Sequence, residues 1–182
     1  MNDEIIIKKL EKAGEDQVSL FRMSDSEDKP LVQFIRRTAK KSAAANLTQT
    51  YVIKESGSPC VLAYISLMCA EIRLDKQYEI DDKVGANRYE YQPAVRIARL
   101  AVCDVCQKKG WGRKLVEFVI GIVLISIQPH AGCRFLILDA KRKSVGFYKK
   151  LGFRLLETEA NKTDENPLMF MDLKSVSESV EA

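Results

Sequence analysis

The sequence predicts a mixed α/β fold, and three features of the chain support this prediction. Segments in which apolar and polar residues alternate, as in strands, are interspersed with segments whose apolar residues follow a helical spacing. The longest apolar run, Phe118 to Ile127, has about half of the roughly 20 residues that a membrane span requires, so it predicts a buried helix. A chain of 182 residues is long enough for one hydrophobic core. We therefore expect a single domain over residues 1–174, followed by a disordered tail over 175–182.

The N-terminal half predicts a strand, a helix and a hairpin, in this order. The alternation in Val18–Met23 predicts a strand. A helix is predicted from Pro30 to about Ala45, because proline favours the first helical turn and the following apolar residues keep a helical spacing. Thr50–Lys54 and Val61–Met68 read as strands on either side of the turn sequence ESGSP, which predicts a β-hairpin.

The C-terminal half predicts further strands and helices after a polar excursion. Residues Arg73–Gln92 lack a clear periodicity, so we expect a long surface loop there. Strands and helices are then expected in the order strand, helix, strand, helix, strand, strand, at Val95–Val102, Gly112–Ile127, Arg134–Asp139, Lys143–Lys150, Phe153–Glu157 and Leu168–Leu173. The polar sequence TEANKTDENP predicts a loop between the last two strands.

Charge and cysteine content exclude several kinds of chemistry. The net charge of +4 and the pI of 8.7 are mildly basic, and the pI is below the value of about 9 that would indicate a nucleic-acid-binding domain by itself. The five cysteines are odd in number and no signal-like N-terminal segment is visible, so reduced thiols and a cytoplasmic location are expected. Cys103 and Cys106 form a C-x-x-C pair without the further ligands that zinc requires, and we expect no metal. The single histidine, His130, lies in the loop-like sequence QPHAG and is expected to be a surface residue.

The stretch CQKKGWGRK, Cys106 to Lys114, combines two glycines with four basic residues between a predicted strand and a predicted helix. The first N–H groups of a helix have no intrahelical partners, and the helix dipole places positive potential there. Glycines allow a phosphate to approach such amides closely. The pattern is neither a P-loop nor a Rossmann fingerprint, but it predicts a cradle for a pyrophosphate.

The order of ARLAV (98–102), this loop, a helix, a strand and GFYKKLGF (146–153) resembles the GNAT superfamily of N-acetyltransferases. Gln107–Gly112 fits the family's Q/R-x-x-G-x-G/A loop at every specified position, and Phe147–Phe153 matches the second half of its A-x-x-F-Y-x-x-x-G-F pattern. The chain departs from the family at Ser144, where alanine is common, and at Lys141, where asparagine is common. The resemblance covers nearly the whole chain and implies a GNAT-type fold, with a central, mostly antiparallel sheet of about six to seven strands flanked by helices.

The resemblance implies acetyl-CoA as cofactor and a primary amine that attacks the thioester carbonyl directly. Tyr148 stands at the family's general-acid position. A phenol with a pKa of about 10 can give its proton to the leaving thiolate. The pyrophosphate is expected on the loop amides and the pantetheine arm along the end of the preceding strand. The cofactor-binding residues implied in this way are Leu100, Ala101, Val102, Gln107, Lys108, Lys109, Gly110, Trp111, Gly112 and Arg113.

No general base is evident, because the strand VRIARLAV carries Arg96 and Arg99 and no carboxylate. A lysine amine has a pKa near about 10.4, whereas an α-amine has a pKa near about 8 and needs less help to lose its proton. The absence of an obvious base therefore favours an acceptor amine of low pKa. The alternative is that Glu90 or a chain of water molecules acts as the general base.

Two basic clusters suggest a phosphate-rich acceptor, although charge runs are also typical of solvated faces. The substrate-binding candidates are Arg36, Arg37, Lys40, Lys41, Lys141, Arg142 and Lys143. LVQFIRRTAKKSAAANLTQTYVI and ARLAV are similar to the GNAT toxins of toxin–antitoxin pairs, which acetylate aminoacyl-tRNA. That resemblance implies charged tRNA as acceptor and an antitoxin protein as partner, with a homodimer left open. A small-molecule or protein amine is the alternative acceptor, and a non-enzymatic acyl-CoA-binding module is the alternative class.

Overall fold

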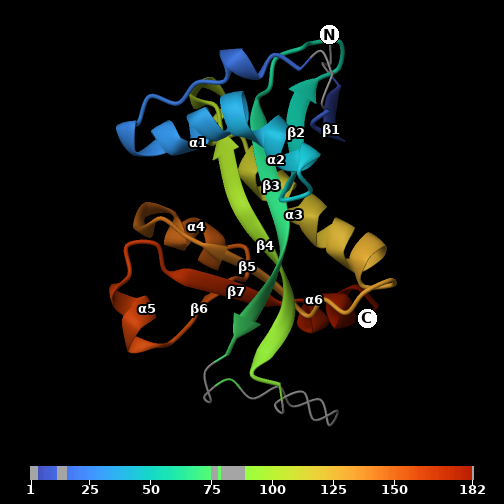
Figure 1. Cartoon of the computed structure of the whole chain (residues 1–182), viewed down its shortest axis with the longest axis vertical. Helices are drawn as coiled ribbons and strands as arrows, with labels where there is room; N and C mark the ends of the chain where they lie inside the picture. The colour runs from blue at the N-terminus through green and yellow to red at the C-terminus, as the bar shows by residue number, and fades with distance from the viewer. Residues whose placement is uncertain (1–3, 12–15, 75–77, 79–88, 182) are drawn as a thin grey trace. The chain divides into compact units, whose positions relative to one another are not determined.

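The computed structural model describes residues 4–11, 16–74, 78 and 89–181 (Figure 1). Its strands are β1 (Ile5–Lys9), β2 (Gln49–Glu55), β3 (Ala63–Arg73), β4 (Tyr91–Val102), β5 (Phe135–Asp139), β6 (Arg154–Leu155) and β7 (Leu168–Asp172). They form a seven-stranded sheet in the order β1-β2-β3-β4-β5-β7-β6. The pair β4–β5 is parallel, whereas β1–β2, β2–β3, β5–β7 and β6–β7 are antiparallel. The predicted mixed fold with a mostly antiparallel sheet is therefore confirmed.

Helices and short helical turns connect the strands. The α-helices are α1 (Lys29–Gln33), α2 (Ala39–Ala44), α3 (Trp111–Ile122), α4 (Val145–Lys149), α5 (Glu159–Thr163) and α6 (Leu173–Glu181). The 3-10 turns are η1 (Val18–Leu20), η2 (Ser26–Asp28), η5 (Asp104–Cys106) and η7 (Arg142–Ser144). Two π-helical turns extend α-helices, at η3 (Phe34–Thr38) and η6 (Val123–Ile127). In the described part of the chain, no helix has both the length and the apolar character that crossing a membrane requires.

The chain divides into two compact units, which β3, β4 and α3 connect. The first unit contains Met1–Met68 and Ile97–Val119, and the second contains Cys69–Arg96 and Ile120–Ala182. The expectation of one domain over residues 1–174 stays a prediction.

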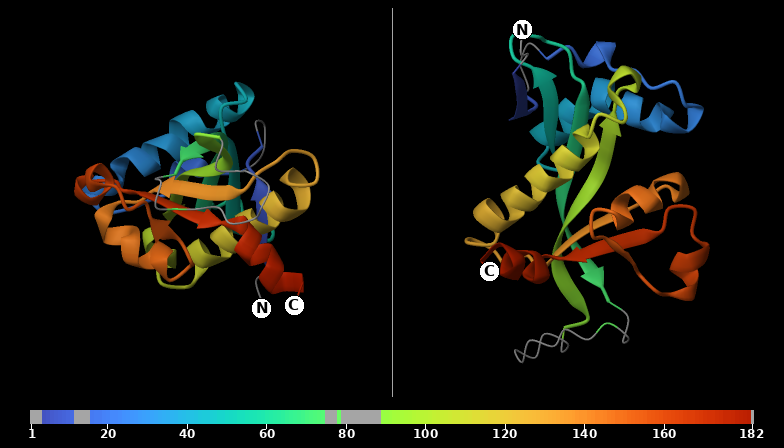
Figure 2. Two further views of the ribbon diagram at one scale, coloured as in Figure 1. Left: turned by 90° about the horizontal axis from the view of Figure 1, so that it is seen from below. Right: turned by 180° about the vertical axis from the view of Figure 1, so that it is seen from behind.

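In the first unit, helices cover both faces of the hairpin formed by β2 and the first part of β3. The consecutive elements α1, η3 and α2 form the first helical run, residues 29–44. Val52 and Tyr64 belong to one buried cluster with Ile35 and Ala39 of this run. Tyr51, which points to the opposite face of β2 because side chains alternate along a strand, contacts the ring of Phe118 on α3 at 5.2 Å. Figure 2 shows α1 and α2 on one side of these strands and the N-terminal part of α3 on the other.

In the second unit, the core is built on aromatic residues of β5 and β7. The rings of Phe135 and Phe170 pack edge to face at 6.1 Å, and Tyr78 contacts both. Ile72 and Ala94 belong to the same buried cluster. β5 is buried over its first four residues, as its apolar sequence predicts.

Most predicted elements are confirmed with shifted ends, but four differ. Val18–Met23 is not a strand and contains η1, while the first strand is β1, which pairs with β2. The predicted loop after β6 contains α5, because the Thr158 side chain accepts a hydrogen bond from the Asn161 N–H and caps the helix. Residues 175–181 of the predicted disordered tail are helical in α6, and residue 182 lies outside the described residues. Asp172 Oδ1 accepts a hydrogen bond from the Lys174 N–H at 3.0 Å in the first turn of this helix. Within the predicted excursion, β3 extends to Arg73 and β4 begins at Tyr91, and residues 75–77 and 79–88 lie outside the described residues.

Candidate active site

The predicted cofactor loop is an exposed turn between β4 and α3 in the first unit. Lys108 and Gly110 have φ angles of 62° and 83°, in the left-handed region that favours glycine. A Cβ added to Gly110 would meet no heavy atom within 4 Å, so the space beside this backbone is open. The helix begins at Trp111, one residue earlier than predicted. The turn therefore presents its backbone and the N-terminus of α3 to solvent.

The loop carries positive charge that is only partly neutralised within the unit. Gln107, Lys108, Lys109 and Gly110 are exposed. Arg113 lies 3.7 Å from Glu117 one helical turn later. Lys114 is stacked over the ring of Trp111, with 4.8 Å between Nζ and the ring centroid. A pyrophosphate fits this environment, since lysines, an arginine and helix-terminal N–H groups all favour an anion.

The end of β4 lies directly beside this loop. Ala101 is buried, whereas Leu100 and Val102 are half-buried. The Gln107 amide donates to the Val102 carbonyl at 3.4 Å and to Asp104 Oδ1 at 3.3 Å. The ten predicted cofactor residues thus lie in two neighbouring stretches of the first unit, Leu100–Val102 and Gln107–Arg113. Their role in cofactor binding stays a prediction.

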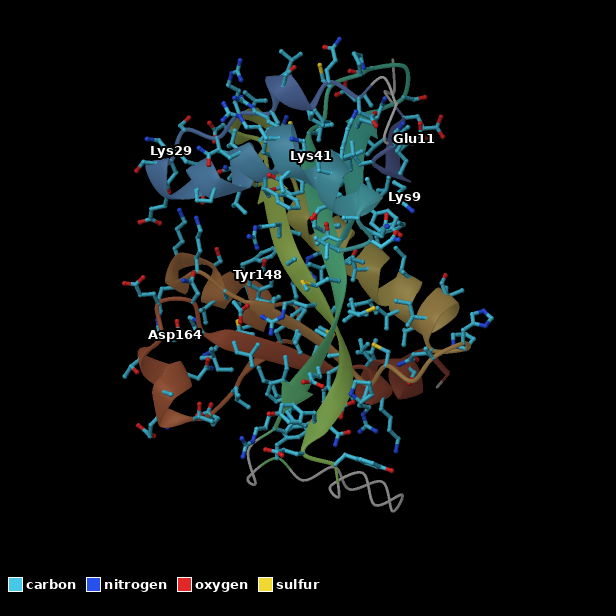
Figure 3. All side chains as sticks on the ribbon, in the orientation of Figure 1. Lys9, Glu11, Lys29, Lys41, Tyr148 and Asp164 are labelled. Carbon is cyan, nitrogen blue, oxygen red and sulfur yellow. The ribbon has the colours of Figure 1, made fainter. Side chains whose placement is uncertain are left out.

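Tyr148 belongs to the second unit, where it lies on α4 (Figure 3). Its side chain is 8% exposed and its ring contacts Phe147 and Phe153, at centroid distances of 5.0 and 5.7 Å. Burial raises the pKa of the Tyr148 hydroxyl well above its usual range near about 10. Among the described residues the hydroxyl has no hydrogen-bond partner, so its proton is not committed elsewhere.

The turn after Tyr148 explains the glycine of the FYKKLGF motif. The Tyr148 carbonyl accepts hydrogen bonds from the Leu151 and Phe153 N–H groups, at 3.0 and 3.1 Å. Gly152 has a φ of 94° and ends the helix, as glycine commonly does at this position. The motif therefore fixes Phe153 against the Tyr148 ring.

The basic residues of the first helical run lie in two environments. Arg36 donates to the Phe21 carbonyl through Nε at 3.1 Å and through NH2 at 2.5 Å, so it also holds the fold together. Arg36 and Arg37 line a groove together with Arg22 and Lys29, two residues that the sequence did not indicate as site residues. Lys40 and Lys41 are not among the lining residues. Lys29 shares a helical face with Arg36 and Arg37 and could have been found by spacing, whereas Arg22 comes from a separate segment.

Lys141, Arg142 and Lys143 lie at the start of η7 in the second unit. Arg142 donates to the Lys162 carbonyl at 2.5 Å and therefore supports the segment of α5. Lys143 is exposed and Lys141 is half-buried. A role of these residues in substrate binding stays a prediction.

Other titratable groups have structural explanations. Cys103 and Cys106 are buried, and burial together with the neighbouring Cys106 thiol raises the pKa of Cys103 to about 12. Within the described residues, no group of three or more histidine, cysteine or acidic side chains is placed to hold a metal ion. His130 is exposed after η6, as predicted. Glu90, the alternative base, forms an ion pair of 3.0 Å with Arg73.

Comparison with solved structures finds similar folds over nearly the whole chain. A tyrosine-to-phenylalanine mutant of KacT has a TM-score of 0.81 at 22% identity, over 96% of this chain and 98% of that chain. AtaT complexed with acetyl-methionyl-tRNAfMet has a TM-score of 0.80 at 23% identity, over 97% and 99%. A mutant of the AtaT toxin bound to acetyl-CoA and the C-terminus of the antitoxin AtaR has a TM-score of 0.75 at 23% identity, over 99% and 100%. None of the curated proteins matches the chain in sequence.

The family comparison is independent of these structures. The model of the acetyltransferase (GNAT) domain matches residues 46–155, which include the end of β4, the glycine-rich loop, α3 and the segment of Tyr148. This match covers more than half of the chain. The protein therefore belongs to the GNAT family of acetyltransferases, enzymes that use acetyl-CoA as the acetyl donor.

Proposed function

We propose that this acetyltransferase modifies the α-amine of an aminoacyl-tRNA. The observation that carries this proposal is the likeness to AtaT complexed with acetyl-methionyl-tRNAfMet, which extends over 97% of this chain. Basic side chains on the first helical run and at η7 support it, because tRNA is an acceptor rich in phosphates. The lack of a carboxylate on β4 also supports it, since an α-amine needs little help to lose its proton.

Separate groups of residues would bind acetyl-CoA and donate the proton that the reaction requires. Acetyl-CoA supplies the acetyl group as a thioester. The amides and cations of Lys108–Arg113 would hold its pyrophosphate, and Leu100–Val102 its pantetheine arm. As the amine nitrogen forms its bond to the carbonyl carbon and the carbon–sulfur bond breaks, Tyr148 would give its proton to the sulfur. The attacking nitrogen loses one proton to solvent, and the Tyr148 phenolate takes one proton from solvent, which restores the hydroxyl.

The partners and location follow from the same likeness. We propose that an antitoxin protein binds this chain. AtaT, whose fold is similar over 99% of this chain, is bound to the C-terminus of the antitoxin AtaR. A cytoplasmic location is part of the proposal, since charged tRNA and acetyl-CoA meet there.

Transfer of radiolabelled acetyl groups to three acceptors tests the proposal. Purified protein is incubated with labelled acetyl-CoA and either a mixture of charged tRNAs, a polyamine, or a peptide with a free N-terminus. We expect label in the charged tRNA, released as an acetyl-amino acid on mild alkaline hydrolysis, and little label in the others. Deacylated tRNA is the matched control. Rapid acetylation of the polyamine or peptide without response to charged tRNA would establish the small-molecule or protein acceptor instead.

A further inference from the structure

The first unit contains a groove of about 450 Å³ beside its first helical run. Its lining residues are Arg22, Met23, Lys29, Val32, Gln33, Arg36 and Arg37. The five that belong to the helical run are three or four residues apart, so they form a single face. The other two come from the segment after Phe21, which runs alongside. The volume lies in the range of about 300 to 1,000 Å³ that is typical of ligand sites.

The groove carries four cationic side chains and no carboxylate among its lining residues. The side chains of Lys29 and Arg37 have no ion pair or hydrogen bond with any described residue. Arg22 donates to the Ser19 carbonyl at 3.1 Å, which leaves its positive charge without a counter-ion. The resulting potential favours an anionic ligand with more than one charge.

Arg36 has a different task from its neighbours. Its two hydrogen bonds to the Phe21 carbonyl tie the helical run to the segment that carries Arg22 and Met23. These bonds join the two walls of the groove at Arg36. Arg36 and Arg37 both belong to the π-helical turn η3, a feature that is frequent at functional sites.

We infer that this groove binds a phosphodiester segment of the acceptor strand, an inference that rests on the proposed function. Guanidinium forks match phosphate oxygens in pairs, and Lys29 adds a point charge. Lys29 and Arg37 are eight residues apart, about 12 Å along a helix, so the groove meets more than one phosphate. Met23 and Val32 provide apolar surface for the sugar or base between them. Arg22, Lys29 and Arg37 are thus the contacts, whereas Lys40 and Lys41 lie outside the groove.

Binding of an uncharged RNA oligonucleotide that ends in CCA tests this inference without any acetyl transfer. Its fluorescence anisotropy is measured with the full chain between about 50 and 200 mM salt. Lys29→Ala and Arg37→Ala should each weaken binding and reduce the log–log salt slope by about 0.7, the value for one lost phosphate contact on a single strand. Arg36 is left intact because its loss would disturb the fold. Lys9→Ala is the matched control, since Lys9 is an exposed cation of the same unit that lies beyond α2 from Lys29 (Figure 3).

A second measurement separates this inference from the proposed function. The ratio of kcat/KM for charged tRNA to kcat/KM for an amino acid methyl ester, which has no phosphate, should fall in Lys29→Ala and Arg37→Ala and should stay at the wild-type value in Lys9→Ala. Unchanged RNA affinity and salt slope in both variants would overturn the groove assignment, even if charged tRNA is acetylated. Tighter binding of an oligoglutamate peptide than of the RNA, lost in the same variants, would also overturn it. Failure of the wild type to acetylate charged tRNA, with the variants still deficient in RNA binding, would overturn the proposed function alone.

Discussion

Tyr148 is the residue whose environment agrees most directly with its proposed role, because burial keeps its hydroxyl protonated, as a general acid requires. Tyr148→Phe keeps the ring contacts to Phe147 and Phe153 and removes only the proton donor. We expect kcat to fall by about 10²- to 10⁴-fold, the usual contribution of a general acid, with acetyl-CoA affinity near that of the wild type. Steady-state kinetics and calorimetry with acetyl-CoA measure the two quantities. A phenylalanine variant with full turnover would leave Tyr148 as a packing residue.

The raised pKa of Tyr148 also predicts a pH profile. Because burial favours the neutral phenol, the hydroxyl stays protonated at and above the usual phenol pKa of about 10. The rate should therefore rise with pH as the acceptor amine loses its proton and should not fall between about pH 8 and 10. A descending limb in that window, measured with acceptor at saturation and absent in Tyr148→Phe, would show that Tyr148 loses its proton there and would contradict the raised pKa.

The cysteine pair before the cofactor loop is predicted to be chemically inert. With its pKa raised to about 12, the Cys103 thiol is almost wholly protonated at neutral pH, and it is also buried. Iodoacetamide at about pH 8 should leave Cys103 unmodified and should label the exposed Cys69, as mass spectrometry of the native protein can show. Labelling of Cys103 before Cys69 would indicate an accessible, activated thiol.

At the scale of elements, the loop before α3 gives the sharpest test of cofactor binding. Gly112→Asp places a carboxylate in the first turn of α3, where it suits the helix dipole but repels a pyrophosphate. At about 100 times its Kd, acetyl-CoA should stabilise the wild type by about 2.7 kcal/mol, a shift of about 5 to 10 °C in Tm. The variant should fold normally and lose this shift. Gly132→Asp, in an exposed position with open space at its Cβ, should retain it.

The helix α5 is short, and its Asn161 side chain links the segment before the helix to the segment after it. The Asn161 amide donates to the Leu156 and Leu168 carbonyls, at 2.8 and 2.9 Å, and accepts from the Leu168 N–H at 2.7 Å. Asn161→Ala leaves the Leu156 carbonyl and the Leu168 N–H without this partner, whereas the Leu168 carbonyl keeps its hydrogen bond from the Leu156 N–H. Each group left unpaired costs about 1 to 3 kcal/mol, so we expect a loss of about 3 kcal/mol in the free energy of unfolding. Denaturant titration measures it. The exposed Asn166→Ala should change stability by less than about 0.5 kcal/mol.

These elements also show what a sequence can and cannot predict. Strands such as β5 and the long helix of α3 and η6 were predictable because burial imposes a clear period on their apolar residues. β1 was missed because five residues, IIIKK, gain their strand structure only by pairing with β2. α5 was missed because its residues are polar and its stability comes from the cap at Thr158 and the contacts of Asn161. The loop motif and Tyr148 were visible in the sequence, whereas Arg22 joins the groove only through the tertiary contact between Arg36 and Phe21.

At the scale of the whole molecule, the charge of +4 is modest, so recognition of a polyanion has to rely on where the cations lie. Lys141 and Lys143 are the predicted contacts on the second unit, and Arg142 is best left unchanged because it holds the Lys162 carbonyl. Lys141→Glu combined with Lys143→Glu should lower kcat/KM for charged tRNA. It should also reduce the log–log salt slope by roughly 1.4 to 1.8 in total, at about 0.7 to 0.9 for each lost phosphate contact.

A control of equal charge decides whether that effect is local or general. Lys9→Glu combined with Arg154→Glu makes the same change in net charge at exposed positions that belong to neither cluster. If phosphate contacts at η7 are the cause, the control keeps the wild-type salt slope, and acetyl-CoA affinity is the same in both double variants. Equal losses in the two would mean that only the overall field of the protein steers the acceptor, because long-range attraction depends on net charge and not on position. No loss in either would assign Lys141 and Lys143 to a solvated face.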